Sequence, residues 1–381
     1  MYDSIVIGCG FAGAVIAREM AEKGKSVLIV EQRSHIGGNC YDALDDYGIL
    51  IHEYGPHIFH TNNKEVYDYL SRFTEWRPYQ HEVVGCIDGM LVPVPFNLNS
   101  LDMVYGREKG SRLREELLSR YGENRKVPIL ELKNSVSEEV RELAQYVYEN
   151  VFLKYTMKQW GQKPEEVDAS VTARVPVYLS RDNRYFQDLY QGMPSRGYTS
   201  LFEAVLDHDN IEVHLNTNGR ERICFGKEGQ VYWEGIPFKG HMIYTGPIDE
   251  LFDLRYGRLP YRTLHFQLEH YDKEYYQSKG VVNYTVSEDY TRITEFKHMT
   301  GQGDGAGTTI MKEYPADYRG REGEIPCYAV INQDNQELYE RYTRLLDHIP
   351  NFHLLGRLAE YKYYNIDAIV EKALQLGKTL D

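Results

Sequence analysis

A short stretch near the carboxyl terminus combines residue types that suit a ligand-binding site. The apolar run 352–355 ends at Gly356-Arg357, three of the four residues at 361–364 are tyrosine, and Asn365 opens a helical pattern. Arginine attracts anions, tyrosine stacks on rings and donates a hydrogen bond, and the start of a helix favours negative charge. The pattern therefore indicates a site rather than packing alone.

Residues 8–13 read GCGFAG, which is a G-x-G-x-x-G pattern. An apolar run suited to a buried strand precedes it, a helical pattern ending at Gly24 follows it, and a second buried strand ends at Glu31. In this context the glycines allow a tight turn and a close backbone approach to a pyrophosphate, the helix start meets its charge, and the acid accepts from ribose hydroxyls. The sequence therefore predicts a bound dinucleotide.

The chain shows no motif for a nucleophile or a metal of its own. It contains no G-x-S-x-G pattern, no C-x-x-C pair and no spacing typical of metal ligands. We therefore expect no metal site, and we expect any covalent chemistry to depend on a bound cofactor.

Three kinds of secondary structure should position these residues. Residues 2–31 predict a βαβ unit that begins a doubly wound, Rossmann-like sheet, and the apolar runs 240–249 and 351–356 resemble strands that return to it. Residues 98–171 carry long, charged helical patterns, and residues 255–318 favour antiparallel strands. The alternating residues expected to share one strand face are Tyr290, Arg292, Thr294, Phe296 and His298.

The expected fold class is α/β, with a discontinuous dinucleotide-binding domain, an inserted helical domain and an antiparallel β-sheet domain. The segment after Trp160 is rich in proline, glycine and charge, and we predict that it is a mobile lid. The expected boundaries are 1–80, 206–250 and 325–381 for the first domain, 98–178 for the helical domain with its lid at 161–178, and 81–97, 179–205 and 251–324 for the sheet domain.

Composition limits the partners. The formal net charge of −14 over 381 residues argues against binding to nucleic acid or to an anionic membrane. Five scattered cysteines favour reduced thiols, no leader pattern opens the chain, and no apolar run approaches the roughly 20 residues of a membrane span. We expect a cytoplasmic protein with no nucleic-acid partner and no membrane insertion.

Further motifs resemble the FAD-binding pattern of a flavoprotein class that includes amine oxidases and Rab escort proteins. Residues 32–39 read QRSHIGGN, residues 244–247 read YTGP, and residues 356–367 read GRLAEYKYYNID. In that class the last motif starts a helix that points at the flavin. The resemblance implies that the dinucleotide is FAD.

Other stretches resemble the UDP-galactopyranose mutase family of the prokaryotic type. They include YGPHIFHT at 54–61, KYTMKQWG at 154–161, RYFQDLYQGMPSRGYTSL at 184–201 and YTRITEFKH at 290–298, and the resemblance covers essentially the whole chain. It implies interconversion of UDP-α-D-galactopyranose and UDP-α-D-galactofuranose for surface glycans, without net redox change, by attack of reduced flavin N5 on the anomeric carbon. It also implies UDP-galactose as substrate, a reduced nicotinamide cofactor as electron donor, and a homodimer.

The same resemblance implies roles for individual residues. Arg174 and Arg292 would act as catalytic residues that face the two phosphates, and His60 would be a catalytic residue on the flavin face near N5. The implied substrate-binding residues are Tyr155, Thr156, Trp160, Arg174, Tyr185, Phe186, Asn283, Arg292, Tyr314, Tyr363 and Asn365. The implied cofactor-binding residues are Gly8, Gly10, Phe11, Ala12, Gly13, Glu31, Gln32, Gly38, Asn39, His57, His60, Thr245, Gly246, Gly356, Arg357, Ile366 and Asp367.

Asn365 departs from the pattern of many family members, in which aspartate follows the tyrosines. An amide lacks the charge of a carboxylate, so we expect an effect on sugar preference or flavin potential rather than on the reaction class. Three further functions stay open at this point. They are the same ring contraction on UDP-N-acetylgalactosamine or another nucleotide sugar, a flavin oxidoreductase of the amine-oxidase type, and a Rab-escort-like binding protein.

Overall fold

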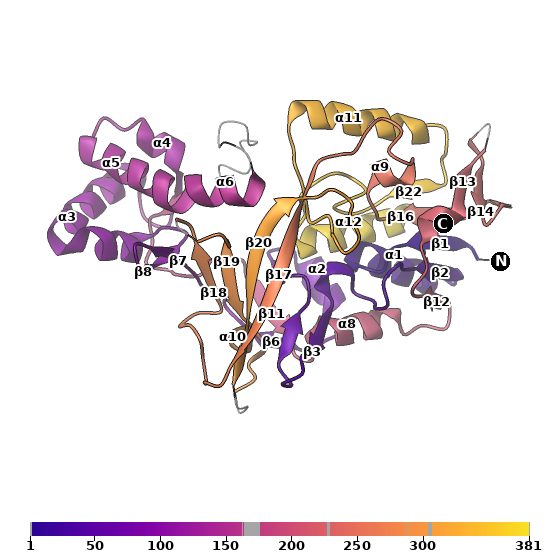
Figure 1. Ribbon diagram of the computed structural model, residues 1–381, viewed down its shortest axis with the longest axis horizontal. Helices are drawn as coiled ribbons and strands as arrows, with labels where there is room; N and C mark the ends of the chain where they lie inside the picture. Colours follow the sequence, from indigo (N-terminus) through magenta and orange to yellow (C-terminus); the bar gives the residue numbers. More distant parts are fainter. Residues whose placement is uncertain are drawn as a thin grey trace.

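The computed structural model describes residues 2–161, 163, 176–226, 229–286, 288–303 and 307–380. Figure 1 shows an elongated molecule with a group of helices at one end, long antiparallel strands in the middle, and a sheet with covering helices at the other end. Both chain termini lie beside that last sheet. The first and last segments of the chain therefore build the same end of the molecule.

A five-stranded parallel sheet forms the end that holds both termini. Its strand order is β12-β2-β1-β16-β22, and every neighbouring pair is parallel. This confirms the predicted Rossmann-like sheet and its returning strands. The order reverses at β1, so the crevice at the carboxyl ends of β1 and β16 is the expected ligand position. The strands are β1 (Ser4–Ile7), β2 (Val27–Val30), β12 (Ile211–His214), β16 (His241–Tyr244) and β22 (Phe352–Leu354).

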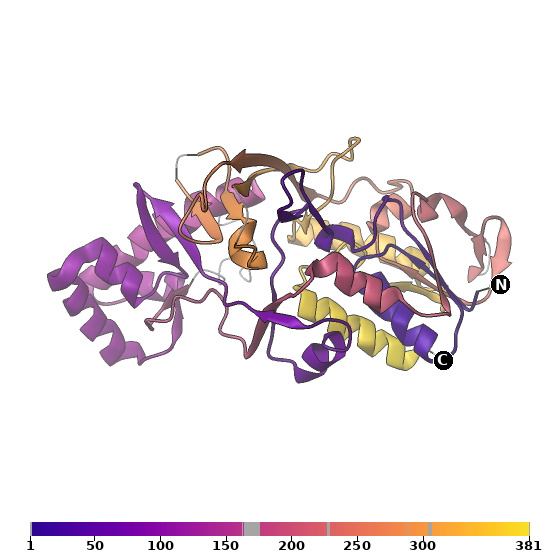
Figure 2. The same cartoon turned by 90° about the horizontal axis from the view of Figure 1, so that it is seen from below.

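Helices cover one face of the parallel sheet and a small sheet covers the other. Helices α1, α8 and α12 lie side by side (Figure 2), with α1 in contact with both of the others. On the opposite face, Ile5 and Ile7 of β1 share a buried cluster with strands β13 and β14. The bounds are α1 (Phe11–Glu22), α2 (Lys64–Leu70), α8 (Gly197–Leu206), α9 (Ile248–Leu251), α11 (Gln333–Thr343), α12 (Ile366–Thr379), β13 (Ile223–Phe225), β14 (Val231–Trp233) and β15 (Ile236–Phe238).

A seven-stranded sheet with the order β21-β17-β20-β19-β18-β7-β8 fills the middle of the molecule. The expected antiparallel sheet is present, but one of its pairs, β18 with β7, is parallel. Its longest strand pair is the antiparallel pair β17 and β20 (Figure 1). The strands are β7 (Val83–Ile87), β8 (Met90–Val94), β17 (Tyr261–Tyr271), β18 (Val281–Tyr284), β19 (Arg292–Glu295), β20 (Thr308–Asp317) and β21 (Tyr328–Ala329).

The strand predicted through residue 298 ends earlier than expected. Strand β19 stops at Glu295, and α10 (Phe296–Thr300) follows directly. Phe296, Lys297 and Met299 are buried on this short helix. The prediction that Phe296 and His298 share a strand face with Arg292 is therefore wrong.

The other end of the molecule is a helical region with its own buried core. Val83, Val94 and other residues of β7 and β8 pack against the helices there. The predicted lid at 161–178 falls mostly outside the described residues, as does Arg174. No helix in the described part of the chain is long and apolar enough to cross a membrane. The elements are α3 (Leu98–Tyr121), α4 (Ile129–Lys133), α5 (Glu138–Val147), a π-helical turn (Tyr148–Leu153), α6 (Lys154–Trp160), β9 (Lys126–Pro128) and β10 (Pro176–Tyr178).

Two segments pair with strands outside the domain to which the expected domain boundaries assign them. Residues 179–205 are expected in the antiparallel sheet, yet β11 (Tyr190–Pro194) pairs with β5 (Phe59–Thr61) and β6 (Trp76–Pro78), and α8 packs on α1. Residues 325–381 are expected in the dinucleotide-binding domain, yet β21 pairs with β17. Both differences arise because short strands join whichever sheet edge lies nearest, which local sequence patterns do not reveal.

A buried carboxylate anchors the start of α8. Asp42, the first residue of β3 (Asp42–Leu44), accepts hydrogen bonds from the backbone N–H groups of Tyr198 at 2.6 Å and Thr199 at 2.8 Å. Strand β3 pairs with β4 (Leu50–His52). Asp42 thus supplies from a distant segment the cap that the helix lacks in its own sequence.

Alanine at Gly197 should destabilise the fold much more than alanine at Gly24. Both glycines have a positive φ, +85° and +81°, which disfavours a side chain by roughly 1–2 kcal/mol. A Cβ at Gly197 would also lie 2.6 Å from Asp42 Oδ2, whereas at Gly24 it would meet nothing of the described chain within 4 Å. In urea titrations we expect the free energy of unfolding to fall by about 1 kcal/mol for Gly24→Ala and about 3 kcal/mol for Gly197→Ala. Equal losses would contradict this role of Asp42.

Candidate active site

Two adjoining cavities lie where the strand order of the parallel sheet reverses. The larger, of about 410 Å³, is lined by the glycine turn after β1, and we call it the glycine-loop cavity. The smaller, of about 210 Å³, is lined by several tyrosines, and we call it the tyrosine cavity. The two cavities are neighbours, because they share six lining residues. These are Asn39, His57, Cys327, Arg357, Asn365 and Ile366.

The structure brings most of the predicted residues to these two cavities. The predicted residues that line the glycine-loop cavity are Gly8, Gly10, Phe11, Ala12, Glu31, Gln32, Gly38, Asn39, His57, Thr245, Gly246, Gly356, Arg357, Asn365 and Ile366. Those that line the tyrosine cavity but not the other one are His60, Tyr155, Tyr185, Phe186, Asn283, Arg292 and Tyr363. Five predicted residues, all in the described part of the chain, line neither. They are Gly13, Thr156, Trp160, Tyr314 and Asp367.

The glycine turn has the shape needed for close approach to a ligand. A Cβ on Gly8 would lie 2.0 Å from Thr245 Oγ1, and a Cβ on Gly38 would lie 2.9 Å from Gly10 Cα. No described side chain caps the N-terminus of α1 at Gly10, so its first N–H groups remain available to an anion. Gly13 serves packing, because its Cβ would lie 1.9 Å from the Gly8 carbonyl oxygen.

Glu31 and Arg33 form the polar wall of the glycine-loop cavity. The Glu31 carboxylate accepts from the backbone N–H groups of Cys9 and Arg33, both at 2.9 Å. Arg33 donates to Asn39 Oδ1 at 2.8 Å and lies over the Tyr54 ring, while its buried Nη1 has no partner among the described residues. A buried, unpaired guanidinium nitrogen beside an uncapped helix fits the pyrophosphate of a dinucleotide. The sequence analysis missed Arg33, although it lies two residues after the predicted acid.

The wall between the cavities is built by Arg357 and the start of α12. Arg357 donates to the carbonyl oxygens of Tyr364 at 2.5 Å and Cys327 at 3.3 Å, and no described side chain caps α12 at Asn365. Asp367 lies behind this wall, where its carboxylate accepts from Thr61 Oγ1 at 3.0 Å. Asp367 therefore ties α12 to β5 instead of facing a cavity.

Arg292 brings a buried positive charge to the tyrosine cavity. Its Nε and Nη2 each donate to the Glu313 carboxylate at 2.7 Å, and Glu313 is 1% exposed. Burial opposes the charge of Arg292, but the Glu313 carboxylate outweighs burial and raises the pKa of Arg292 well above its usual value. The cavity wall thus carries a permanent cation whose orientation is fixed by a bidentate pair.

Tyr328 takes the place that was predicted for Tyr314. Tyr314 follows Glu313 in β20, and because successive strand residues face opposite sides, it points away from the cavity and donates to Gln267 Oε1 at 3.2 Å. Tyr328 lines the cavity next to Tyr363, with ring centroids 6.2 Å apart. Tyr328 was not predicted, because it lies in none of the motifs that identified the other site residues.

Two predicted residues of α6 lie beside the cavity. Thr156 is buried, and the Trp160 ring lies 6.0 Å from the Tyr328 ring. Asn283 does line the cavity, and its buried Oδ1 has no hydrogen-bond partner among the described residues. An unpaired buried amide oxygen favours a ligand that donates a hydrogen bond there.

Buried histidines surround the cavities. Burial lowers the pKa of His57 and of His81, both of which line the tyrosine cavity, to about 3, and it lowers the pKa of His52 to about 4. His52 Nδ1 accepts the backbone N–H of His57 at 3.0 Å. These rings are neutral at physiological pH and serve as polar, uncharged wall groups. His81 was not predicted, because a single histidine between strands carries no motif.

The buried histidines should make the fold sensitive to acid. An unfolded histidine takes up a proton below its usual pKa of about 6.5, whereas folded His52 stays neutral down to about pH 4. The unfolded state therefore binds more protons in this window, and stability falls as the pH falls. In urea titrations, the free energy of unfolding should fall between pH 7 and pH 5. We expect this fall to be up to about 2 kcal/mol larger in the wild type than in His52→Gln. The same pH dependence in both proteins would contradict a neutral His52.

Sequence comparisons connect this site to known proteins. A family model described as UDP-galactopyranose mutase matches residues 150–363, and one described as an NAD(P)-binding Rossmann-like domain matches residues 6–73. A probable UDP-galactopyranose mutase of Klebsiella pneumoniae is 35% identical over 97% of this chain and 92% of its own. The UDP-galactopyranose mutase of Mycoplasma pneumoniae is 34% identical over 100% of this chain and 96% of its own. A dTDP-fucopyranose mutase of Escherichia coli is 33% identical over 99% and 98%.

Solved structures share the fold. A reduced UDP-galactopyranose mutase matches with a TM-score of 0.70 at 16% identity, covering 99% of this chain and 95% of its own. Putrescine oxidase matches with a TM-score of 0.59 at 14% identity, covering 99% and 98%. At this identity the two likenesses concern the fold alone. The family model and the full-length relatives show that the chain belongs to the UDP-galactopyranose mutase family.

Proposed function

We propose that this protein interconverts UDP-α-D-galactopyranose and UDP-α-D-galactofuranose, with FAD in the glycine-loop cavity and the UDP-sugar in the tyrosine cavity. The observation that carries the proposal is that the two cavities share six lining residues, so that a sugar in one cavity would lie next to a cofactor in the other. When bound in its reduced form, FAD supplies a nucleophilic nitrogen, N5, for displacement at the anomeric carbon. The remaining tasks are binding and orientation, and they belong to the chain.

The glycine-loop cavity would hold the cofactor by its charge and its hydroxyls. The uncapped start of α1 and the free Nη1 of Arg33 suit the pyrophosphate, and Glu31 suits the ribose. The start of α12 would approach the flavin, with His57 as an uncharged neighbour and His60 from the other cavity on the flavin face. Gln32, Asn39, Thr245 and Ile366 would complete the contacts.

The tyrosine cavity would hold the diphosphate while the sugar rearranges. Arg292 offers fixed positive charge, and the hydroxyls of Tyr155, Tyr185, Tyr328 and Tyr363 offer hydrogen bonds. Burial raises the pKa of Tyr155 to about 12, so this hydroxyl keeps its proton and remains a donor. The displaced UDP would stay bound and return to the same carbon. Arg174 would add a second cation from the proposed lid.

Uncharged side chains would contact the sugar and the base. Phe186 suits the uridine ring, with Thr156 and Trp160 as neighbours, and the Asn283 amide oxygen suits a sugar hydroxyl. Asn365 lines both cavities and offers an amide where charge would otherwise stand. A second candidate, the same reaction on another nucleotide sugar, is supported by the dTDP-fucopyranose mutase of similar identity.

A flavin oxidoreductase of the amine-oxidase type has less support. The relative (S)-6-hydroxynicotine oxidase is 26% identical over only 25% of this chain, so its likeness does not reach the tyrosine cavity as a whole. Family membership supports a homodimer and a reduced nicotinamide cofactor as electron donor. The five free cysteines fit a cytoplasmic location.

Lysine at position 292 should weaken nucleotide binding without removing the cofactor. Lysine keeps the charge but cannot form the bidentate pair with Glu313, so the cation loses its fixed position. By calorimetry we expect the dissociation constant for UDP to rise by about tenfold or more in Arg292→Lys, with unchanged flavin absorbance. The control is Arg181→Lys, an exposed arginine outside both cavities. Equal UDP affinity in Arg292→Lys and wild type would count against diphosphate binding at this arginine.

The proposed reaction is tested by anaerobic incubation of dithionite-reduced protein with UDP-galactofuranose and chromatography of the products. UDP-galactopyranose should appear with reduced protein and not with oxidised protein. Conversion of dTDP-fucofuranose instead would favour the second candidate. If yellow protein that binds UDP converts neither compound, the mutase proposal is wrong.

A further inference from the structure

The loop 184–189 contacts His60 through two side chains. Phe186 stacks on the imidazole, with ring centroids 3.5 Å apart and an angle of 12° between the planes. Asp188 Oδ2 lies 2.7 Å from His60 Nδ1. Stacking fixes the plane of the ring, and the hydrogen bond fixes which edge of the ring faces the loop.

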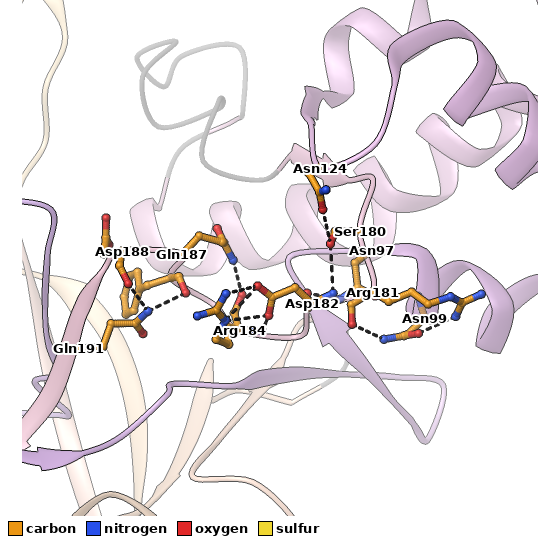
Figure 3. A network of polar contacts seen from close by, with 11 residues as sticks. Asn97, Asn99, Asn124, Ser180, Arg181, Asp182, Arg184, Gln187, Asp188 and Gln191 are labelled. Atoms are coloured by element: carbon orange, nitrogen blue, oxygen red, sulfur yellow. Dashed lines mark hydrogen bonds and ion pairs between the residues drawn. The ribbon is translucent and has the colours of Figure 1, made fainter.

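The carboxylate of Asp188 is itself held in place. Its second oxygen, Oδ1, accepts from Asn62 Nδ2 at 2.5 Å, and Asn62 Oδ1 accepts the backbone N–H of Leu189 at 3.0 Å. Gln191 Nε2 donates to the carbonyl oxygens of Asp188 at 2.8 Å and Phe186 at 3.1 Å. Figure 3 shows Gln191 and Asp188 at one end of this network, with Arg184 and Asp182 further along toward the helical region. These contacts therefore fix the orientation of the Asp188 carboxylate without any bound ligand.

The partner of a histidine determines which ring nitrogen carries the proton. An ionised carboxylate only accepts hydrogen bonds, so Nδ1 of His60 must be the donor toward Asp188. Nε2 makes no hydrogen bond to any described residue, and the ring lines the tyrosine cavity. A neutral His60 held in this way presents a lone pair at Nε2 to whatever occupies the cavity.

We propose that Asp188 is a positioning residue that fixes His60 as the Nδ1–H tautomer and leaves Nε2 as an acceptor for the bound ligands. This inference deepens the proposed function. It rests on that function only for the identity of the bound ligands. The Asp188 carboxylate thereby holds the imidazole in one orientation as well as in one tautomer.

A matched control, Asp182, lies just before this loop. Asp182 accepts from Arg184 Nε at 3.0 Å and from its Nη2 at 2.7 Å, so it too is a paired carboxylate of this network (Figure 3). Neither Asp182 nor Arg184 lines the cavities formed by the described residues. Loss of the Asp182 charge tests the loop alone, whereas loss of the Asp188 charge tests the loop and the histidine.

The test uses holoprotein labelled with ¹⁵N-histidine, in which long-range ¹H–¹⁵N spectra identify the tautomer of each ring. The His60 signals are assigned by their loss in His60→Gln. We expect the Nδ1–H form in the wild type and in Asp182→Asn, and a mixed or Nε2–H form in Asp188→Asn. Asp188→Glu should restore the wild-type form. Turnover should fall by about tenfold to a hundredfold in Asp188→Asn only, while the dissociation constant for UDP changes less than about twofold.

Three results would overturn the proposal. They are an Nε2–H form in the wild type, a wild-type tautomer in Asp188→Asn, and equal losses of turnover in Asp182→Asn and Asp188→Asn, which would make Asp188 a loop anchor. The two proposals fail separately. A tautomer that shifts in Asp188→Asn, in a protein that converts no nucleotide sugar, would support the role of Asp188 and contradict the proposed function.

Discussion

The site depends on keeping one positive charge at the wall of a buried cavity. An arginine taken out of water needs a compensating carboxylate, and Arg292 finds it directly across the sheet, where Glu313 is its partner in the register of β19 and β20. The carboxylate must not occupy every N–H donor of the guanidinium, because the cation must still bind a diphosphate. A bidentate pair achieves this because it uses Nε and Nη2 and leaves the remaining donors of the guanidinium for a ligand. A protein with a formal net charge of −14 can attract an anion only through such a local arrangement.

Two parts of the site attract anions in different ways. The parallel sheet offers helix starts and backbone N–H groups, which hold charge without any charged side chain, at α1 and α12. The tyrosine cavity offers side chains, namely the Arg292–Glu313 pair, the tyrosine hydroxyls and the neutral histidines. The shared wall at Arg357 lies where the two kinds meet. Two anionic ligands can therefore be neighbours in one crevice, because each is balanced by its own part of the site.

Local sequence patterns predicted those parts of the site that consist of one continuous stretch of backbone. The glycine turn, Glu31 and the start of α12 follow from spacing and context, and the structure has them where they were predicted. Residues that depend on the register of long-range strand pairs were less accessible. Tyr314 was predicted to face the cavity, but it follows Glu313 on β20 and therefore faces the other side of the sheet. Tyr328, which lines the cavity from β21, was missed. Asp188 was missed because its partner His60 lies on another element, and His81 because a single histidine carries no motif. The helix α10 was missed because the alternating pattern was extended past Glu295, where β19 ends.

The division of the parallel sheet between the first and last parts of the chain has a consequence for biosynthesis. Thr245 bonds to the carbonyl of Ile7 across 238 positions, and α12 completes the cover of α1 only near the carboxyl terminus. On the ribosome, β1 and α1 must wait with their apolar surfaces exposed until most of the chain has emerged, whereas the helical region, whose core lies within residues 83–179 apart from Val281, can form earlier. The nascent flavin site is thus among the last parts to close. A truncated product would contain a folded helical region beside an open, aggregation-prone nucleotide fold, which cellular quality control can recognise.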